Sequence, residues 1–259
     1  MPSQSSACQR CVFAKGCPLL QRLPATAHRH IAPGTLMGYR LFERDEALFR
    51  SGDAFDRLYV LCSGSAKLLE IHPQGTSQIF SFYFPRDVLG LDAVELHHHE
   101  GTAIALEATL VCQLSFEGLA SAAQHSKAIG DCLHHLWSQE VQREYTALRL
   151  RAPKTAVERL ALFLIHLAQH RVDPSGGWNE LHLVMSRHDL GDYLGLSEET
   201  VSRGISALQH KGAIAADKRT IRLLDQAALA QAAGLDGEAA AFSSPSANPA
   251  AAKFHGQWG

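Results

Sequence analysis

One segment, residues 186–212, constrains the fold of this chain more than any other. Its apolar residues follow helical spacing at two places: Leu190 and Leu194, and then Val201, Ile205 and Leu208. Gly195 lies between the two sets, where a glycine permits the sharp turn that joins two helices. Ser197 is a candidate N-cap, because its side-chain oxygen can accept a hydrogen bond from the first turn of the following helix. The segment therefore predicts a helix over about 187–194, a glycine turn and a second helix, which is a helix-turn-helix.

The second predicted helix carries a polar face opposite its apolar stripe. Four residues share that face: Glu199, Ser202, Arg203 and Ser206. A carboxylate accepts from cytosine N4, arginine donates to guanine O6 and N7, and serine pairs with several bases, so these types suit base-pair edges. The alternative is an ordinary helical hairpin in which Glu199 and Arg203 form a solvated ion pair. Because the helices, turn, cap and polar face occur together, the segment favours double-stranded DNA as a partner.

Charge around this segment indicates that one copy alone binds DNA weakly. Residues 154–224 hold nine Lys and Arg against eight Asp and Glu, and the whole chain has a formal net charge of -2. Attraction between one such domain and the phosphate backbone is therefore modest. We expect the DNA-binding form to be a homodimer.

The chain before this segment divides into three regions by its pattern. Residues 1–30 show little periodicity and are expected to be an arm that needs a partner to order it. Residues 31–125 hold short β-branched and aromatic runs separated by turn residues, which predicts a jelly-roll β-domain. The runs lie at 58–61, 66–71, 79–84 and 111–114. Residues 126–152 form one long predicted helix that Pro153 ends.

The expected fold class is α+β, with the β-domain, the long helix and a C-terminal winged helix-turn-helix in that order. The DNA-binding domain is assigned to residues 153–225, where two strand-like runs at 213–216 and 220–224 predict the wing. Residues 236–259 are rich in Ala, Ser and Pro and poor in bulky apolar side chains. That composition predicts a disordered tail.

The long helix has a heptad-like seam that predicts dimerisation. Its members follow 4-3-4-3 spacing: Trp137, Val141, Glu144, Leu148 and Arg151, with Leu133 as an extension. In a symmetric parallel pair Glu144 approaches its own copy, and like charges in a partly desolvated seam repel each other. Either Glu144 is solvated or paired with Arg143 or Arg151, or it weakens the dimer so that pairing needs assistance. The sequence leaves both interpretations open.

The chain has six cysteines, and their compartment decides how they are interpreted. No signal peptide opens the sequence and no apolar run approaches the roughly 18 residues of a membrane span, so we expect a cytoplasmic protein with reduced thiols. Cys8, Cys11 and Cys17 stand close together in the N-terminal region. Three thiolates at this spacing indicate a soft metal or an iron–sulfur cluster.

A cluster normally takes four thiolates, and the spacing does not choose the fourth. The candidates are Cys62, Cys112 and Cys132, of which Cys62 is interpreted as a small buried residue at a strand end and Cys132 as a helix-face residue. Zinc is one alternative, although structural zinc sites more often use two short cysteine pairs and this sequence has no second pair. A thiol redox switch without any metal is another alternative. The histidines at 97–99 and 134–135 are expected to be solvated surface residues, since consecutive side chains diverge.

Four stretches together resemble the Crp/Fnr superfamily of bacterial transcription regulators, within it the oxygen-sensing fumarate-and-nitrate-reduction branch. They are the cysteines at 8–17, ALEATLVC at 105–112, AVERLA at 156–161 and DYLGLSEETVSR at 192–203. The resemblance covers about Cys8 to Leu224. It implies a [4Fe–4S] cluster on four residues: Cys8, Cys11, Cys17 and Cys112. It also implies that oxygen converts this cluster to a [2Fe–2S] form and favours the inactive monomer.

The same resemblance implies roles for other residues. Glu199, Ser202 and Arg203 read a palindrome similar to TTGAT-N4-ATCAA, and the acidic residue aligned with Glu144 opposes dimerisation. RNA polymerase is an implied partner, although Thr76 stands where some relatives carry an acidic contact residue. Residues 89–93 lack the arginine with which nucleotide-binding members hold phosphate, so no nucleotide is expected.

An enzymatic function is not expected, because the sequence shows no paired carboxylates, nucleophile elbow or phosphate loop. The alternative function is a Crp/Fnr-type regulator that responds to another signal, namely thiol redox state, zinc, haem or a nucleotide.

Overall fold

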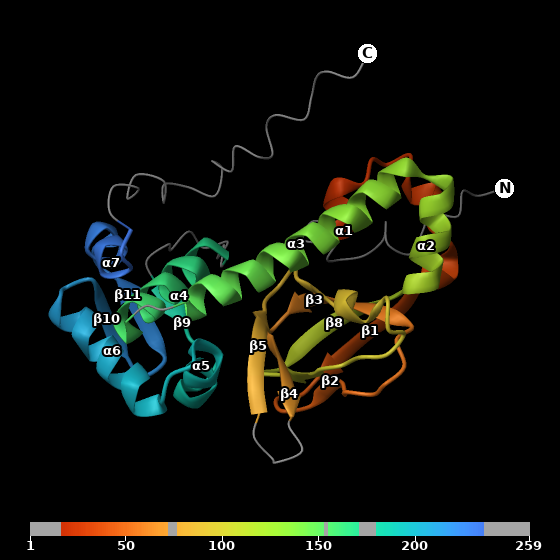
Figure 1. Cartoon of the computed structure of the whole chain (residues 1–259). Helices are drawn as coiled ribbons and strands as arrows, with labels where there is room; N and C mark the ends of the chain where they lie inside the picture. The colour runs from red at the N-terminus through yellow and green to blue at the C-terminus, as the bar shows by residue number, and fades with distance from the viewer. Residues whose placement is uncertain (1–16, 72–76, 153–154, 171–179, 236–259) are drawn as a thin grey trace. The chain divides into compact units, whose positions relative to one another are not determined.

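The computed structural model describes residues 17–71, 77–152, 155–170 and 180–235, and these form two compact units that divide between residues 149 and 150 (Figure 1). The strands of the first unit are β1 (Leu36–Phe42), β2 (Ala47–Phe49), β3 (Arg57–Ser63), β4 (Ala66–Ile71), β5 (Ser77–Tyr83), β6 (Val88–Leu89), β7 (Thr102–Ala105) and β8 (Thr109–Ser115). They pair into two four-stranded antiparallel sheets, in the orders β1-β8-β3-β6 and β2-β7-β4-β5. The predicted β-domain of an α+β chain is confirmed.

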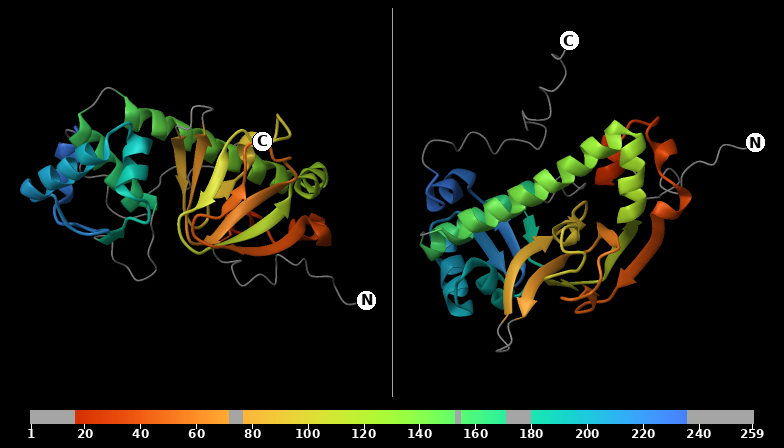
Figure 2. Two further views of the ribbon diagram at one scale, coloured as in Figure 1. Left: turned by 90° about the horizontal axis from the view of Figure 1, so that it is seen from below. Right: turned by 45° about the vertical axis from the view of Figure 1, so that its right-hand side comes forward.

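Strand β3, inside the β1-β8-β3-β6 sheet, sends alternate side chains to the two faces of the sheet, and both sets are buried. Leu58 and Val60 of β3 enter a core cluster shared with the helices of this unit. Tyr59 and Leu61, which point the other way, enter a second cluster between the two sheets. Figure 2 shows the strands and helices of this unit from two further sides.

The region just before β1 is ordered, which differs from the expected arm over residues 1–30. From Cys17 onward it forms α1 (Pro18–Arg22) and two short 3₁₀ helices, His28–His30 and Pro33–Thr35. Four apolar side chains anchor it in the same core cluster as Val60: Leu19, Leu23, Ala27 and Ile31. Burial of these side chains stabilises the region without any added group. Residues 1–16, with Cys8 and Cys11, lie outside the described residues.

Two helices follow β8, α2 (Phe116–His125) and α3 (Lys127–Arg151). Ser115 caps α2, because its Oγ accepts a hydrogen bond of 3.1 Å from the backbone N–H of Gly118. The helix predicted over 126–152 is α3, within one residue at each end. Pro153, which was expected to end it, lies outside the described residues.

The second unit contains α4 (Ala156–His170), β9 (Glu180–His182), α5 (Arg187–Leu194), α6 (Glu198–His210), β10 (Ile214–Asp217), β11 (Thr220–Leu223) and α7 (Gln226–Ala232). The two strand-like runs predicted as a wing are β10 and β11, and β9 completes a three-stranded sheet in the order β10-β11-β9. Helix α7 lies beyond the boundary predicted at 225. It belongs to the fold, because Leu229, Ala230 and Ala232 are buried.

Two expectations about burial are corrected, a solvated His99 and a buried Cys62. His99 is only 1% exposed, and its ring stacks on Phe49 with centroids 3.7 Å apart. Cys62 is half-buried rather than buried. No helix among the described residues is long and apolar enough to cross a membrane. The predicted tail at 236–259 lies outside the described residues.

Candidate functional site

Helices α5 and α6 form the predicted helix-turn-helix, with the bounds and the turn expected from the sequence. Gly195 adopts the left-handed conformation at φ 66° directly after α5, where a side chain is disfavoured. Ser197 caps α6, since its Oγ accepts a 3.1 Å hydrogen bond from the N–H of Thr200. Val201, Ile205 and Leu208 are all at most 3% exposed, so the apolar stripe of α6 faces the core of this unit.

Two further residues hold the turn, and the sequence analysis did not single them out. At Gly191 a Cβ atom would lie 2.6 Å from the carbonyl oxygen of Leu196, so the chain can fold back only over a glycine. Arg159 of α4 donates from Nη1 to the carbonyl oxygen of Leu194 at 2.9 Å. The angle between the helices is therefore fixed by a glycine inside α5 and by an arginine outside the motif.

The polar face of α6 is open to solvent. Glu199, Ser202, Arg203 and Ser206 are all exposed. Glu199 Oε1 and Arg203 Nη2 are 3.7 Å apart, with 77% and 72% of the side chains exposed. An ion pair this exposed contributes about 0–1 kcal/mol. Both side chains can therefore leave each other for a base pair at little free-energy cost.

The described cysteines gather around one core cluster of the first unit. Cys112 of β8 and Cys132 of α3 are buried members of this cluster, and Cys17 and Cys62 pack against it partly buried. Cys17 stands directly before α1, and Cys112 lies on a strand that is paired on both sides. Cys17, the third cysteine of the N-terminal motif, therefore packs against the same core cluster that contains Cys112.

Cys132 differs from the other thiols in its surroundings. Its Sγ lies 3.9 Å from the carbonyl oxygen of Leu19 and its residue is 3% exposed. Burial raises the pKa of this thiol to about 11, so it stays protonated at neutral pH. Among the described residues no three His, Cys, Asp or Glu side chains gather as a metal site. Cys8 and Cys11 lie outside that range.

The predicted seam of α3 is divided between the interior and the surface. Leu133 is buried, and Trp137 is half-buried, donating from Nε1 to the carbonyl oxygen of Leu91 at 3.3 Å. Val141 and Leu148 are 52% and 63% exposed. Tyr145, which the sequence analysis missed, is 58% exposed beside them. The exposed apolar stripe of α3 therefore consists of Val141, Tyr145 and Leu148, and Glu144 is exposed next to it.

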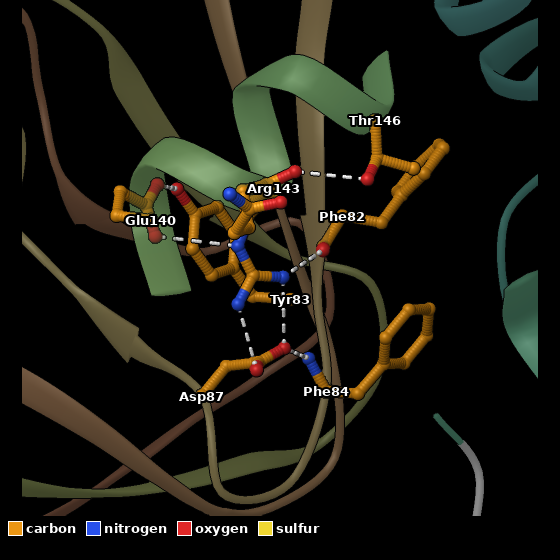
Figure 3. A network of polar contacts seen from close by, with 8 residues as sticks. Phe82, Tyr83, Phe84, Asp87, Glu140, Arg143 and Thr146 are labelled. Carbon is orange, nitrogen blue, oxygen red and sulfur yellow. Dashed lines mark hydrogen bonds and ion pairs between the residues drawn. The ribbon is translucent and has the colours of Figure 1, made fainter. Parts of the chain in front are cut away.

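A buried polar network joins α3 to the end of β5 and the residues that follow it (Figure 3). Tyr83 donates its hydroxyl to Glu140 Oε1 at 2.6 Å. Arg143 lies 2.7 Å from Asp87 and 3.2 Å from Glu140, and its guanidinium stacks 4.5 Å from the centroid of the Tyr83 ring. Burial raises the pKa of Glu140, and Arg143 and the Tyr83 hydroxyl act against that rise.

The two arginines suggested as partners of Glu144, Arg143 and Arg151, both make other polar contacts. Arg143 is committed to Asp87 and Glu140, and Arg151 donates from Nε to the carbonyl oxygen of Tyr193 at 2.8 Å. The carboxylate of Glu144 acts on Glu140, whose pKa it raises further. The negative charge of Glu144 therefore disfavours ionisation of the buried carboxyl group one turn earlier on α3.

Comparison with known families assigns both units. Residues 39–126 match the cyclic nucleotide-binding domain, and residues 158–232 match the Crp-like helix-turn-helix domain. The transcriptional activator protein Anr of Pseudomonas protegens is 35% identical over 195 residues, which are 75% of this chain and 80% of that protein. The fumarate and nitrate reduction regulatory protein of Escherichia coli K12 is 32% identical over 230 residues, 88% of this chain and 90% of that protein.

The chain belongs to the Crp/Fnr family of transcription regulators. Crp/Fnr regulators are dimeric DNA-binding proteins rather than enzymes, and α5 and α6 are the DNA-binding helices of this one. The solved structure of FixK2 from Bradyrhizobium japonicum is similar in fold, with a TM-score of 0.69 and 28% identity. It covers 75% of this chain and 96% of its own.

Proposed function

We propose that this Crp/Fnr regulator controls transcription in response to oxygen through a [4Fe–4S] cluster. The proposed ligands are Cys8, Cys11, Cys17 and Cys112. The observation that carries the proposal is that Cys17 and Cys112, far apart in the sequence, pack against one core cluster. Cys8 and Cys11 precede Cys17 by only a few residues, so the same place can receive four thiolates.

The donor set and its surroundings fit such a group. Four thiolates are the ligands that iron–sulfur clusters take, and an apolar setting limits the access of water. When bound, the cluster supplies a redox-active centre that oxygen can destroy. Cys112 offers a fixed ligand because β8 is hydrogen-bonded on both sides. Cys132, the other buried thiol of this core cluster, is left out of the proposed set because the resemblance to the Fnr branch implies Cys112 as the fourth ligand.

The chain couples this site to dimerisation through α1 and α3. Leu19 of α1 and Cys132 of α3 are in contact, so residues that hold Cys17 in place also support the long helix. In the dimer, burial of Val141, Tyr145 and Leu148 favours association, and the two copies of Glu144 oppose it. We propose that these two effects are close to balance, and that holding residues 8–17 against Cys112 tips the balance toward the dimer.

The dimer presents two copies of α6 to two half-sites of a palindrome. We propose that Glu199, Ser202 and Arg203 read a sequence similar to TTGAT-N4-ATCAA, with bound regulator contacting RNA polymerase. The charge of one DNA-binding domain is nearly balanced, so a monomer gains little from phosphate contacts alone. The monomer–dimer equilibrium is therefore the proposed switch.

Cluster loading of cysteine variants tests the proposal. Wild type and the variants Cys112→Ser, Cys62→Ser and Cys132→Ser are purified without oxygen, and iron and acid-labile sulfide are counted for each. We expect about four iron and four sulfide per chain in wild type, Cys62→Ser and Cys132→Ser, and loss of both in Cys112→Ser. Cys62→Ser is the matched control, because Cys62 packs against the same hydrophobic core cluster that contains Cys112 but is not a proposed ligand.

Three outcomes would overturn the proposal. Zinc or haem in the anaerobic wild type would replace the cluster as the bound group. Full iron and sulfide in Cys112→Ser would remove its fourth ligand. Unchanged sedimentation and operator binding after exposure of the loaded wild type to air would remove the oxygen response.

A further inference from the structure

Three large apolar side chains stand exposed along β1. Tyr39 and Leu41 alternate on this strand and are 42% and 56% exposed, and Met37, at the bulge just before them, is 45% exposed. Strand β1 is also the edge of its sheet. Proteins usually cover or charge an edge strand that carries apolar side chains, because such an edge promotes association. We call these three residues the β1 face.

The β1 face continues the surface that carries Cys112. Tyr39 is paired with Cys112, and Leu41 is paired with Leu110, in the antiparallel register of β1 and β8. Directly opposed residues of antiparallel strands project from the same side of a sheet. Helices cover this side at Cys112, which is 8% exposed, and leave it open one strand further, at Tyr39.

The N-terminal sixteen residues have the length, the starting point and the composition to cover this face. The described chain begins at Cys17, which packs against the core cluster that contains Cys112. Val12 and Phe13 stand only five and four residues before Cys17, which lets them reach up to about 14–18 Å from it. Cys17 packs against the same core cluster as Leu36, the first residue of β1, so the β1 face is within reach. The segment between Cys11 and Cys17 contains two bulky apolar residues in succession, Val12 and Phe13. Both would remain in water if nothing covered them.

We propose that residues 1–16 dock on the β1 face, with Val12 and Phe13 packed against Met37, Tyr39 and Leu41. This inference rests on the proposed function, in which Cys8 and Cys11 come to Cys112, the residue paired with Tyr39 across the two strands. The β1 face is then the second half of the sensor site. It shields the thiolates from solvent, and apolar contact there favours the same arrangement of residues 1–16 that the four ligands need.

Photo-crosslinking from position 13 tests the contact directly. Phe13 is replaced by p-benzoyl-phenylalanine, the protein is loaded without oxygen, iron and sulfide are counted, and the sample is irradiated and mapped by mass spectrometry. We expect crosslinks within one chain to residues 37–41. Crosslinks elsewhere in the same chain, or a dimer-sized product joined to a second copy, would overturn the inference while the proposed function stands. Wild-type protein without iron and sulfide would instead overturn the proposed function.

Proteolysis measures the strength of the docking. Lys15 gives trypsin a cleavage site in the segment, and Leu41→Ser removes part of the β1 face without touching a cysteine. We expect cleavage after Lys15 to be about tenfold faster in loaded Leu41→Ser than in loaded wild type, because one apolar contact is lost. Leu96→Ser is the matched control, since Leu96 is a leucine of similar exposure, 42%, outside β1. Equal cleavage rates in wild type, Leu41→Ser and Leu96→Ser at equal iron content would refute docking on this face.

Discussion

The hydrogen bond between Tyr83 and Glu140 offers a quantitative test of how α3 is held. Tyr83→Phe removes the hydroxyl that donates to Glu140 at 2.6 Å and leaves the aromatic ring in place. The side chain of Glu140 is 16% exposed, so water replaces the lost donor only in part. A hydrogen bond to a charged group contributes about 1.5–3 kcal/mol. We therefore expect the free energy of unfolding of the first unit to fall by about 2 kcal/mol.

The assay is urea unfolding followed by the fluorescence of Trp137, which lies half-buried on α3. Trp178 and Trp258 are replaced by Phe in every protein compared, so that the signal reports the first unit alone. With a slope of about 2 kcal/mol per molar urea, the expected fall moves the midpoint down by about 1 M. Tyr145→Phe is the matched control, because Tyr145 is on the same helix and 58% exposed. A Tyr83→Phe midpoint equal to that of Tyr145→Phe would refute the reasoning.

The pH dependence of the same difference is a second check. Burial raises the pKa of Glu140 in the folded protein above that in the unfolded chain. The stability that protonated Glu140 contributes is therefore lost as the pH rises from the unfolded-state pKa through the folded-state pKa. Removal of the Tyr83 hydroxyl raises this pKa further, and the variant loses more stability over that window. The difference between wild type and Tyr83→Phe should therefore be larger at about pH 7 than at about pH 4. A difference that does not change with pH would mean that the carboxylate does not accept this hydrogen bond as an anion.

Three further substitutions separate dimerisation, DNA reading and the turn. Glu144→Ala should sediment as a dimer in air, because the opposing charge is removed. Glu117→Ala, on α2, is the control and should stay as monomeric as aerobic wild type. A monomeric Glu144→Ala would contradict the proposed balance. Arg203→Ala should lose about 1–3 kcal/mol of discrimination between operator and unrelated DNA at fixed salt, with Arg44→Ala as an unaffected control. Gly191→Ala should destabilise the second unit by about 1–3 kcal/mol in calorimetry, because its Cβ would lie 2.6 Å from a backbone oxygen. Gly130→Ala, where a Cβ meets nothing within 4 Å, should not destabilise.

The helix-turn-helix was predictable because its signals are local. Gly195, in the left-handed conformation, ends α5, and the cap at Ser197 begins α6. The apolar spacing within each helix completes a set of signals that all lie in the segment itself. Gly191 shows where local reasoning stops. A glycine inside a helix gives no turn signal in the sequence. The requirement for glycine at this position becomes visible only in the structure, where the Leu196 carbonyl oxygen lies too close for a Cβ atom.

The ordering of residues 18–31 was not predictable from their own pattern. Leu19, Leu23, Ala27 and Ile31 recur every four residues, but Pro24 interrupts the segment, and the pieces on either side are too short to be stable helices alone. Their partners lie on β3, β8 and α3, which are far along the chain. Stability here comes from tertiary burial, which periodicity within the segment does not report.

The dimer seam shows the same limit in another form. Helical spacing correctly groups Val141 and Leu148, but it cannot tell which side of α3 its own fold already covers. Trp137 is occupied with Leu91, and Tyr145 takes a place in the exposed stripe. Knowing which side chains of α3 are exposed required the position of the sheet as well as the phase of the helix.

The exposed polar face of α6 has a consequence for how a regulator of this kind can diverge. Glu199 and Arg203 contact each other weakly, while Val201, Ile205 and Leu208 hold the helix in place from its other side. If Glu199 and Arg203 read DNA as proposed, mutations at these outer positions change the preferred DNA sequence without a penalty in folding. The set of promoters recognised can drift between lineages while the scaffold is conserved. The fold and its targets are free to evolve at different rates.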